Sequence, residues 1–251
     1  MRERFMILLC SLAAIGALAL QSPAQAQTVA KRRAEVTTTE RLEFGSRGTI
    51  QIVDSFGEVS VEGWDKPEVE LTITKKTQKQ YDPKKLAKGL KELERIRIEM
   101  EQVSESSLLV IKTTFPSRTP ARLMRGKTNV NLEYRIRVPR HSSLMIKHDI
   151  GEVQVANVDG DIEATNRIGE IHLRMPGENQ YAVDARVKIG DVSSEFTPAD
   201  YSRQKLLGAK MESNLPPSTR RLYLRVGIGD IQVSKMPDEK ADKQIEKKAP
   251  N

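Results

Sequence analysis

The stretch Ile150-Gly151-Glu152-Val153-Gln154-Val155 decides how this chain folds, because its pattern returns several times. The unit is an apolar residue, glycine, an acid, a β-branched residue, a polar residue and a second apolar residue. Alternation of apolar and polar residues is typical of β-strands, and glycine marks a bend or turn. The other copies, one of them truncated, are Phe56-Gly57-Glu58-Val59-Ser60-Val61, Ile168-Gly169-Glu170-Ile171-His172-Leu173, Ile189-Gly190-Asp191-Val192-Ser193 and Ile228-Gly229-Asp230-Ile231-Gln232-Val233.

The spacing of these copies predicts stacked β-coils. Gly151 and Gly169 lie 18 residues apart, and Gly169 and Gly190 lie 21 apart. The 39 residues from Gly190 to Gly229 divide into 18 and 21 at Gly208, a degenerate copy that lacks the acid. A period near 20 with internal glycines indicates an all-β fold, a β-solenoid or β-helix-like stack of short strands with glycine turns. A β-sandwich is the alternative.

The chemistry of the unit makes further predictions. Glycine supplies a positive φ or a close backbone approach at a corner, and the flanking Ile and Val are expected to point into a shared core. Stacked strands lie roughly 4.8 Å apart, so the aligned acids would form a like-charge ladder. Arg167 and Lys188, each two residues before a glycine, are candidates to compensate it, and calcium is the alternative. The acids of this ladder are Glu152, Glu170, Asp191 and Asp230.

Upstream of the repeats the sequence predicts short strands, one helix and a hairpin. Period-2 alternation marks strands over 49–53, 59–61 and 69–73, separated by Gly57, Gly63 and Pro67. Asp82 is a plausible N-cap before Pro83, and the leucines that follow share one face, which predicts a helical insertion over about 83–94. The period then returns to two, giving a hairpin over 95–114 and a long strand over 130–139.

The first residues resemble an export signal. Arg2 and Arg4 precede an apolar run over 5–20, and Ala24-Gln25-Ala26 offers a cleavage site after Ala26. We therefore expect a signal peptide over 1–26, a linker over 27–39, the β-repeat domain over 40–236 and a disordered charged tail over 237–251. This predicts an exported protein, periplasmic or at the cell surface or secreted, with no transmembrane span after signal removal. Because the single cysteine lies at position 10, the mature chain has no thiol for disulfides, zinc or catalysis.

The charge of the chain argues against nucleic acid as a partner. The net charge is +7, of which the predicted signal peptide contributes +1, so the mature chain carries +6. Acids are interspersed throughout and aromatic residues make up only 4 % of the chain, unlike a nucleic-acid groove. Basic residues do crowd a predicted loop over 115–127, which is either a solvated loop or a contact surface for anionic envelope polymers or lipid headgroups. They are Arg118, Arg122, Arg125 and Lys127.

Enzyme signatures are sparse. The three histidines, His141, His148 and His172, lie in no metalloprotease or nucleophile-elbow motif, so we assign no catalytic residue, cofactor or metal site. A β-helix enzyme acting on acidic polysaccharide remains an alternative, because carboxylates from different coils could converge. Trp64 either packs over the core at a strand end or forms a rim for stacking on sugars.

A longer stretch carries a family resemblance. Ser55-Phe56-Gly57-Glu58-Val59-Ser60-Val61-Glu62-Gly63-Trp64-Asp65, the Val138-Pro139 strand end and the serial glycine-acid repeats resemble the bacterial putative-adhesin domain family over roughly residues 40–236. The resemblance implies an exported, mostly β repeat domain at the cell envelope, and it transfers no catalytic residue. The expected function is a non-catalytic binding or structural module whose partner is an envelope polymer or envelope protein, with a calcium-stiffened solenoid as a further alternative. The ligand and the oligomeric state stay open.

Overall fold

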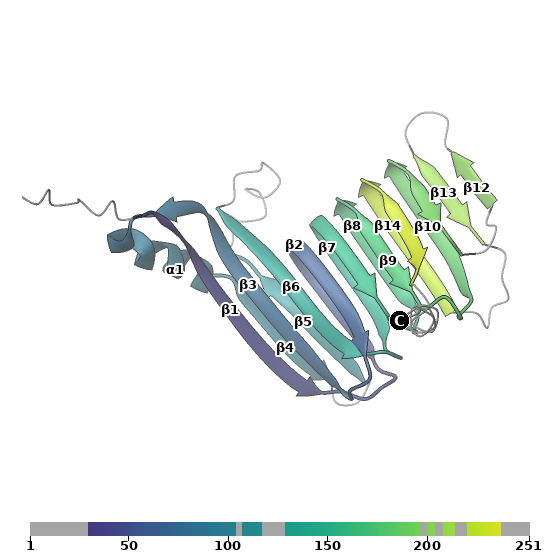
Figure 1. The fold of residues 1–251 in the computed structure, drawn as a ribbon, viewed down its shortest axis with the longest axis horizontal. Helices are drawn as coiled ribbons and strands as arrows, with labels where there is room; N and C mark the ends of the chain where they lie inside the picture. Colours follow the sequence, from purple (N-terminus) through teal and green to yellow (C-terminus); the bar gives the residue numbers. More distant parts are fainter. Residues whose placement is uncertain are drawn as a thin grey trace, which may run out of the picture.

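A computed structural model of the chain describes residues 30–103, 107–116, 129–196, 200–203, 208–213 and 220–236. These residues form an all-β protein with one short helix and a single large mixed sheet of 15 strands. Figure 1 shows the strands side by side along the length of the molecule, with the helix at one end and β12 and β13 at the other. The elements are β1 (Arg32–Glu43), β2 (Thr49–Trp64), β3 (Glu68–Tyr81), η1 (Pro83–Lys85), α1 (Leu86–Glu94), β4 (Arg97–Val103), β5 (Leu108–Thr114), β6 (Val130–Pro139), β7 (Ser143–Ala156), β8 (Ile162–Ile168), β9 (Ile171–Met175), β10 (Tyr181–Ile189), β11 (Val192–Ser194), β12 (Asp200–Arg203), β13 (Ala209–Glu212), β14 (Arg220–Ile228) and β15 (Ile231–Lys235).

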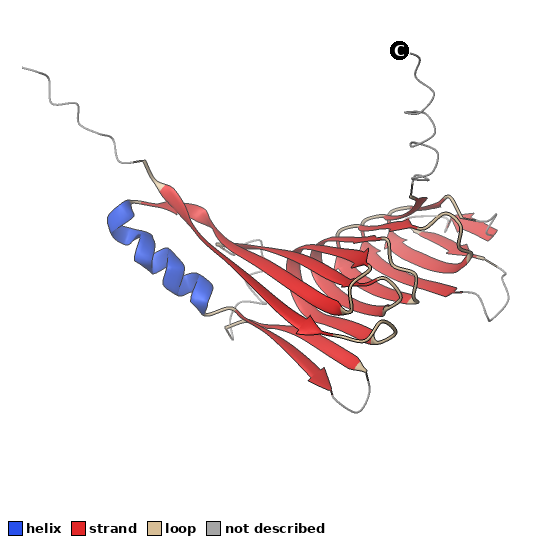
Figure 2. Ribbon diagram, turned by 60° about the horizontal axis from the view of Figure 1, so that its bottom comes forward, coloured by secondary structure: helices blue, strands red, loops and turns tan. Residues whose placement is uncertain are grey.

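Each repeat forms one layer of the stack, which we call a rung. A rung consists of two strand segments, or arms, one before the glycine and one after it. The rungs β8–β9, β10–β11 and β14–β15 change strand at the glycine, whereas β2 and β7 run through it as continuous strands. Figure 2 shows these arms as successive layers along the stack. The prediction of two short strands divided at Gly57 is therefore wrong for β2: the φ of 105° at Gly57 bends the strand while its pairing with β7 continues. Neighbouring rungs pair in parallel, as a stack of coils requires.

The order of the rungs in space differs from their order in the chain. The last rung, β14–β15, lies between β8–β9 and β10–β11, so the rungs do not follow a coil-by-coil progression along the chain. The chain departs from this progression after β11, where β12 and β13 form an antiparallel pair and β13 covers the far side of β10. Gly208 therefore precedes an antiparallel strand and is no corner of the stack, and its φ lies outside the positive region.

The core lies between the two sets of arms. The residue after each acid is buried, as predicted: Val59, Val153, Ile171, Ile231 and Val192 are at most 4 % exposed. The sequence also places the isoleucine before each glycine inside, and this prediction is wrong for Ile168, Ile189 and Ile228, which are 40–47 % exposed. The positive φ of the following glycine turns the chain at the corner, so the residues on both sides of it face outward.

The N-terminal half extends the stack on one side. Before its corner β2 pairs with β5, and after the corner it pairs with β6, to which β3 and then β1 add in antiparallel fashion. The linker expected over 27–39 overlaps β1, which pairs with β3 between Arg32 and Glu43. The helix and the hairpin β4–β5 form where predicted. Asp82 precedes the helix, but its side chain makes no capping hydrogen bond.

A buried hydroxyl pair ties β5 to β6 across the core. The hydroxyl groups of Thr113 and Tyr134 lie 2.8 Å apart, and the two residues are 3 % and 0 % exposed. Thr113→Val is expected to lower the free energy of unfolding by about 2 kcal/mol, because it leaves the buried Tyr134 hydroxyl without this partner. Urea denaturation measures the change. The double variant with Tyr134→Phe should cost less than Thr113→Val alone, and a double variant that costs the sum of both singles would contradict the coupling.

Candidate binding face

The second arms present a polar outer face on the side away from the core. The parallel register places the acids that follow the corner glycines in one row across this face, which confirms the predicted carboxylate ladder. Because the last rung is inserted into the stack, the order differs from the chain order. Across the stack it is Glu58, Glu152, Glu170, Asp230 and Asp191, and Glu133 of β6 extends the row beyond Glu58.

Neighbouring polar groups compensate the ladder. His172 Nε2 lies 2.7 Å from Glu170 Oε2 and 3.6 Å from Glu152 Oε1, and the Gln154 amide donates to Glu152 at 2.8 Å. One oxygen of Asp230 accepts the backbone N–H of Asp191 at 2.7 Å. Arg167, expected to compensate the ladder, contacts Asp149 at 3.4 Å. Among the described residues, His, Cys, Asp and Glu side chains form no group of three that could hold a metal ion.

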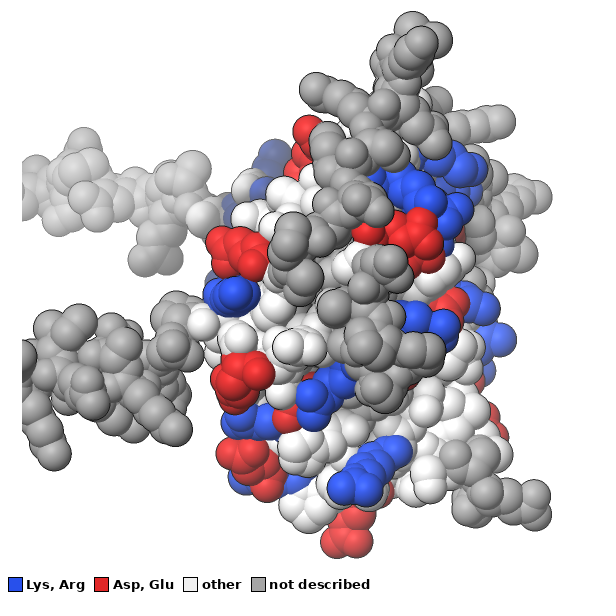
Figure 3. All heavy atoms as spheres, turned by 90° about the vertical axis from the view of Figure 1, so that its right-hand side faces the viewer, with Lys and Arg blue, Asp and Glu red and all other residues white. Residues whose placement is uncertain are grey.

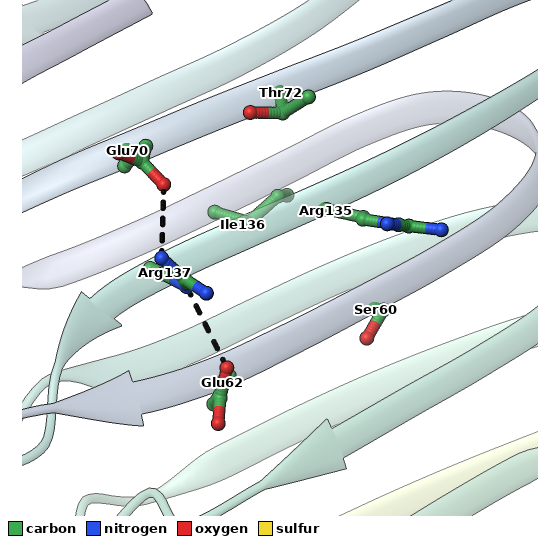
Figure 4. A pocket seen from close by; sticks show the side chains of 7 residues that line it. All are labelled: Ser60, Glu62, Glu70, Thr72, Arg135, Ile136 and Arg137. Carbon is green, nitrogen blue, oxygen red and sulfur yellow. Dashed lines mark hydrogen bonds and ion pairs between the residues drawn. The ribbon is translucent and has the colours of Figure 1, made fainter. Parts of the chain in front are cut away.

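A shallow hollow of about 380 Å³ lies on the outer face where β2, β3 and β6 adjoin. Figure 4 shows Arg137 between Glu70 and Glu62, with Arg135 further along the same strand. Arg135 and Arg137 lie on the same side of β6, because strand residues two apart share a face. The residues that line the hollow are Ser60, Glu62, Glu70, Thr72, Arg135, Ile136 and Arg137.

Glu70 organises the floor of this hollow. Its side chain is only 12 % exposed, and it accepts a hydrogen bond from Arg41 Nε at 2.7 Å and one from Arg137 at 3.3 Å. Arg137 also lies 3.6 Å from Glu62. Arg135 donates to Glu133 at 2.7 Å and keeps 73 % of its side chain exposed. The hollow therefore holds exposed guanidinium groups in fixed positions beside carboxylates and hydroxyls.

Trp64 stands next to this hollow, at the end of β2. Trp64 lies on the same outward side of β2 as Ser60 and Glu62, because alternate strand residues share a face. Its indole N–H donates to the carbonyl of Glu68 at 2.9 Å. Lys66 and Arg137 lie over its ring at 4.8 and 5.6 Å. Trp64 is thus half-buried on the outer face rather than packed over the core.

The sequence did not single out the hollow. Its residues come from three strands that are brought together by the pairing of β6 with β2 and with β3. The sequence alone does not reveal that β3 and β6 pair. Arg135 and Arg137 alternate with apolar residues over 130–139, which was the one available signal. The residues singled out instead, Arg118, Arg122, Arg125 and Lys127, lie outside the described part of the chain. Phe115, just before them, packs on Phe56 with ring centroids 4.8 Å apart.

The histidines take three separate structural positions. His148 is buried on β7 and hydrogen-bonds to the Gly57 carbonyl at 3.2 Å, and burial lowers its pKa from 6.5 to about 4. On the next rung, Asn166 stands opposite His148 and donates to the Gly151 carbonyl at 2.8 Å. Each of these two buried side chains thus hydrogen-bonds to the backbone carbonyl of a corner glycine, on consecutive rungs. His141 contacts Asp159 at 2.9 Å, away from His172 on the ladder.

Charges at the end of the stack are mixed. Figure 3 looks at the end that carries β12 and β13, and it shows basic and acidic side chains interspersed with uncharged ones over the part of the surface that is described. Acid–base pairs also form between β10 and β14 and within β10: Arg225 contacts Asp184 at 2.8 Å, and Arg186 contacts the same carboxylate at 3.4 Å. Within the described ranges no helix has the length and hydropathy to cross a membrane.

Two solved structures are similar to this chain. One is described as a putative cell adhesion protein from Clostridium sporogenes: the sequences are 11 % identical, the TM-score is 0.45, and the match covers 80 % of this chain and 100 % of that one. The other is described as a putative adhesin from Bacteroides fragilis, with 10 % identity, a TM-score of 0.29, and coverage of 80 % of this chain and 97 % of that one. No family model matches the chain, and no curated protein matches it.

Proposed function

We propose that this chain is an exported, non-catalytic binding module of the cell envelope, and that the hollow on its outer face contacts an envelope polymer. The observation that carries the proposal is the hollow itself, in which two exposed arginines, two carboxylates and two hydroxyls face outward from three paired strands. The resemblance of residues 40–236 to the putative-adhesin family supports it.

The chemistry of the hollow favours a ligand that both donates and accepts hydrogen bonds. Guanidinium groups only donate, ionised carboxylates only accept, and the hydroxyls of Ser60 and Thr72 do both. A glycan chain with hydroxyl and acidic substituents meets all three needs. Ion pairs and strand pairing hold these groups in place before binding, which lowers the entropy lost on association.

The test is co-sedimentation of the purified protein with isolated peptidoglycan and with isolated membranes, at low and high salt. We expect saturable binding to peptidoglycan that weakens with salt, and about tenfold weaker binding for the double variant Arg135→Ala/Arg137→Ala, because charge-assisted hydrogen bonds contribute the most per contact. The fold should survive, because Arg41 still pairs with Glu70.

Two controls make the result specific. Arg186→Ala removes an arginine of similar exposure from β10 and should leave binding unchanged. Neutralising Arg118, Arg122 and Arg125 tests the basic segment as the contact surface instead. Unaltered binding by Arg135→Ala/Arg137→Ala, or binding lost only with the basic segment, would contradict the proposal.

A further inference from the structure

An exposed row of isoleucines runs along the corner of the stack. We call Ile150, Ile168, Ile228 and Ile189, in their spatial order, the isoleucine stripe. The parallel register pairs Ile150 with Ile168, Ile168 with Ile228, and Ile228 with Ile189. The last three are 40, 47 and 41 % exposed, and Ile150 is partly buried.

The stripe holds three of the four large hydrophobic residues that are exposed among the described residues. Isolated apolar residues at a surface are common, but a contiguous row marks an interaction site. The same row continues to Phe56, which pairs with Ile150 and is only 5 % exposed. Phe115 packs on Phe56 and covers it. At the Phe56 position the row is therefore buried by an apolar side chain from another segment.

We propose that a second copy of this chain covers the isoleucine stripe with its own stripe. The first argument is the repeat distance. The isoleucines follow the strand spacing of roughly 4.8 Å, whereas an extended peptide places side chains on one face about every 6.6 Å and a helix rises about 5.4 Å per turn. The side chains of an extended peptide or of a helix would therefore not stay opposite successive isoleucines over four rungs. A second stack of parallel strands has the same repeat along its whole length.

The second argument is the charge on the two flanks of the stripe. One flank is the carboxylate ladder, and the other is formed by the residues that precede the isoleucines, among them Arg167 and Lys188, both exposed. A two-fold axis parallel to the stripe places the ladder of each copy against the Arg167 flank of the other. The pairs Glu170 with Arg167 and Asp191 with Lys188 then face each other across the interface.

Charge favours a two-fold axis parallel to the stripe over one perpendicular to it. A two-fold axis perpendicular to the stripe would place the ladder of one copy against the ladder of the other, which like-charge repulsion opposes. With the parallel axis a single rung is unfavourable, where Glu152 faces Asp149. There Asp149 already contacts Arg167 within its own chain, and Glu152 accepts a hydrogen bond from Gln154.

The contact is narrow, so the dimer should be weak. Each copy would contribute only four stripe residues and their flanks, and small interfaces are typical of weak complexes. We therefore expect sedimentation equilibrium to show self-association that rises with protein concentration. The triple variant Ile168→Ser/Ile189→Ser/Ile228→Ser should stay monomeric and folded, because these side chains are exposed in the single chain.

Cross-linking tests the geometry directly. In a Cys10→Ser background the variant Ile189→Cys carries a single thiol, and a short bismaleimide should join two copies of it. Ile189 is the last residue of the stripe, so only the parallel axis brings it next to its own counterpart. Ser193→Cys, on the same rung but four residues further along the chain, is the matched control and should not cross-link.

Three outcomes would overturn the proposal. The wild-type chain could remain monomeric in sedimentation up to about 1 mM. The two cysteine variants could cross-link equally, or the triple serine variant could associate as the wild type does. A monomer in which the stripe instead binds an apolar segment of another protein would appear as the first of these outcomes.

Discussion

Gly169→Ala is expected to lower the free energy of unfolding by about 3 kcal/mol or more, a large effect for the addition of one methyl group. Gly169 has a φ of 128°, which an L side chain rarely adopts, and a Cβ at this position would lie 1.9 Å from the carbonyl oxygen of Gly151. That oxygen belongs to the neighbouring rung, so relief would require two rungs to separate. The melting temperature should fall by about 10 °C for a chain of this size.

A matched substitution separates this effect from the general cost of replacing glycine. Gly45→Ala adds the same methyl group where nothing lies within 4 Å and φ is outside the positive region, so its free energy of unfolding should change by less than about 0.5 kcal/mol. Urea denaturation followed by circular dichroism measures both variants. Equal stability of Gly169→Ala and Gly45→Ala would show that the corners do not stack as closely as described.

Acidification is expected to destabilise the protein through His148. Burial lowers the pKa of His148 to about 4, whereas the unfolded chain titrates near 6.5. Between these values the unfolded state binds a proton that the folded state does not, so stability is complete above pH 6.5 and is lost as the pH falls toward 4. Over this window the contribution of His148 amounts to about 3 kcal/mol.

His148→Asn isolates this contribution. Asn166 occupies the equivalent place on the next rung and bonds the neighbouring glycine carbonyl with a side chain that does not titrate. The variant should keep the bond to Gly57 and show a shallower fall in stability between pH 6.5 and 4 than the wild type, measured by urea denaturation at several pH values. Identical pH profiles would assign the acid sensitivity to other groups.

Much of the stack could be predicted from local pattern. The repeated glycine-acid unit predicted the corners, the parallel alignment of the carboxylate ladder and the buried residue after each acid. These features repeat within about six residues, and periodicity reports them directly. The alternation over 130–139 likewise predicted the strand that forms β6.

The remaining features depend on contacts between distant segments. The last rung, β14–β15, is inserted between β8–β9 and β10–β11, and β13 covers the other side of β10. The spacing of the glycines does not encode this order. The exposure of Ile168, Ile189 and Ile228 depends on the backbone direction at the glycine that follows, and an isoleucine at the end of a strand gives no sign of it in the sequence. The hollow requires β3 to lie beside β6, and its residues come from separate parts of the sequence.

The central claim is that the hollow on the outer face binds an envelope glycan, and amide chemical shifts in the ¹⁵N-labelled protein test it most directly. Titration with soluble peptidoglycan fragments should shift the amide resonances of Ser60, Thr72, Arg135 and Arg137 saturably, while those of β13 and β10 stay in place. Shifts confined to other strands, or no shifts at concentrations at which intact peptidoglycan sediments the protein, would contradict the claim.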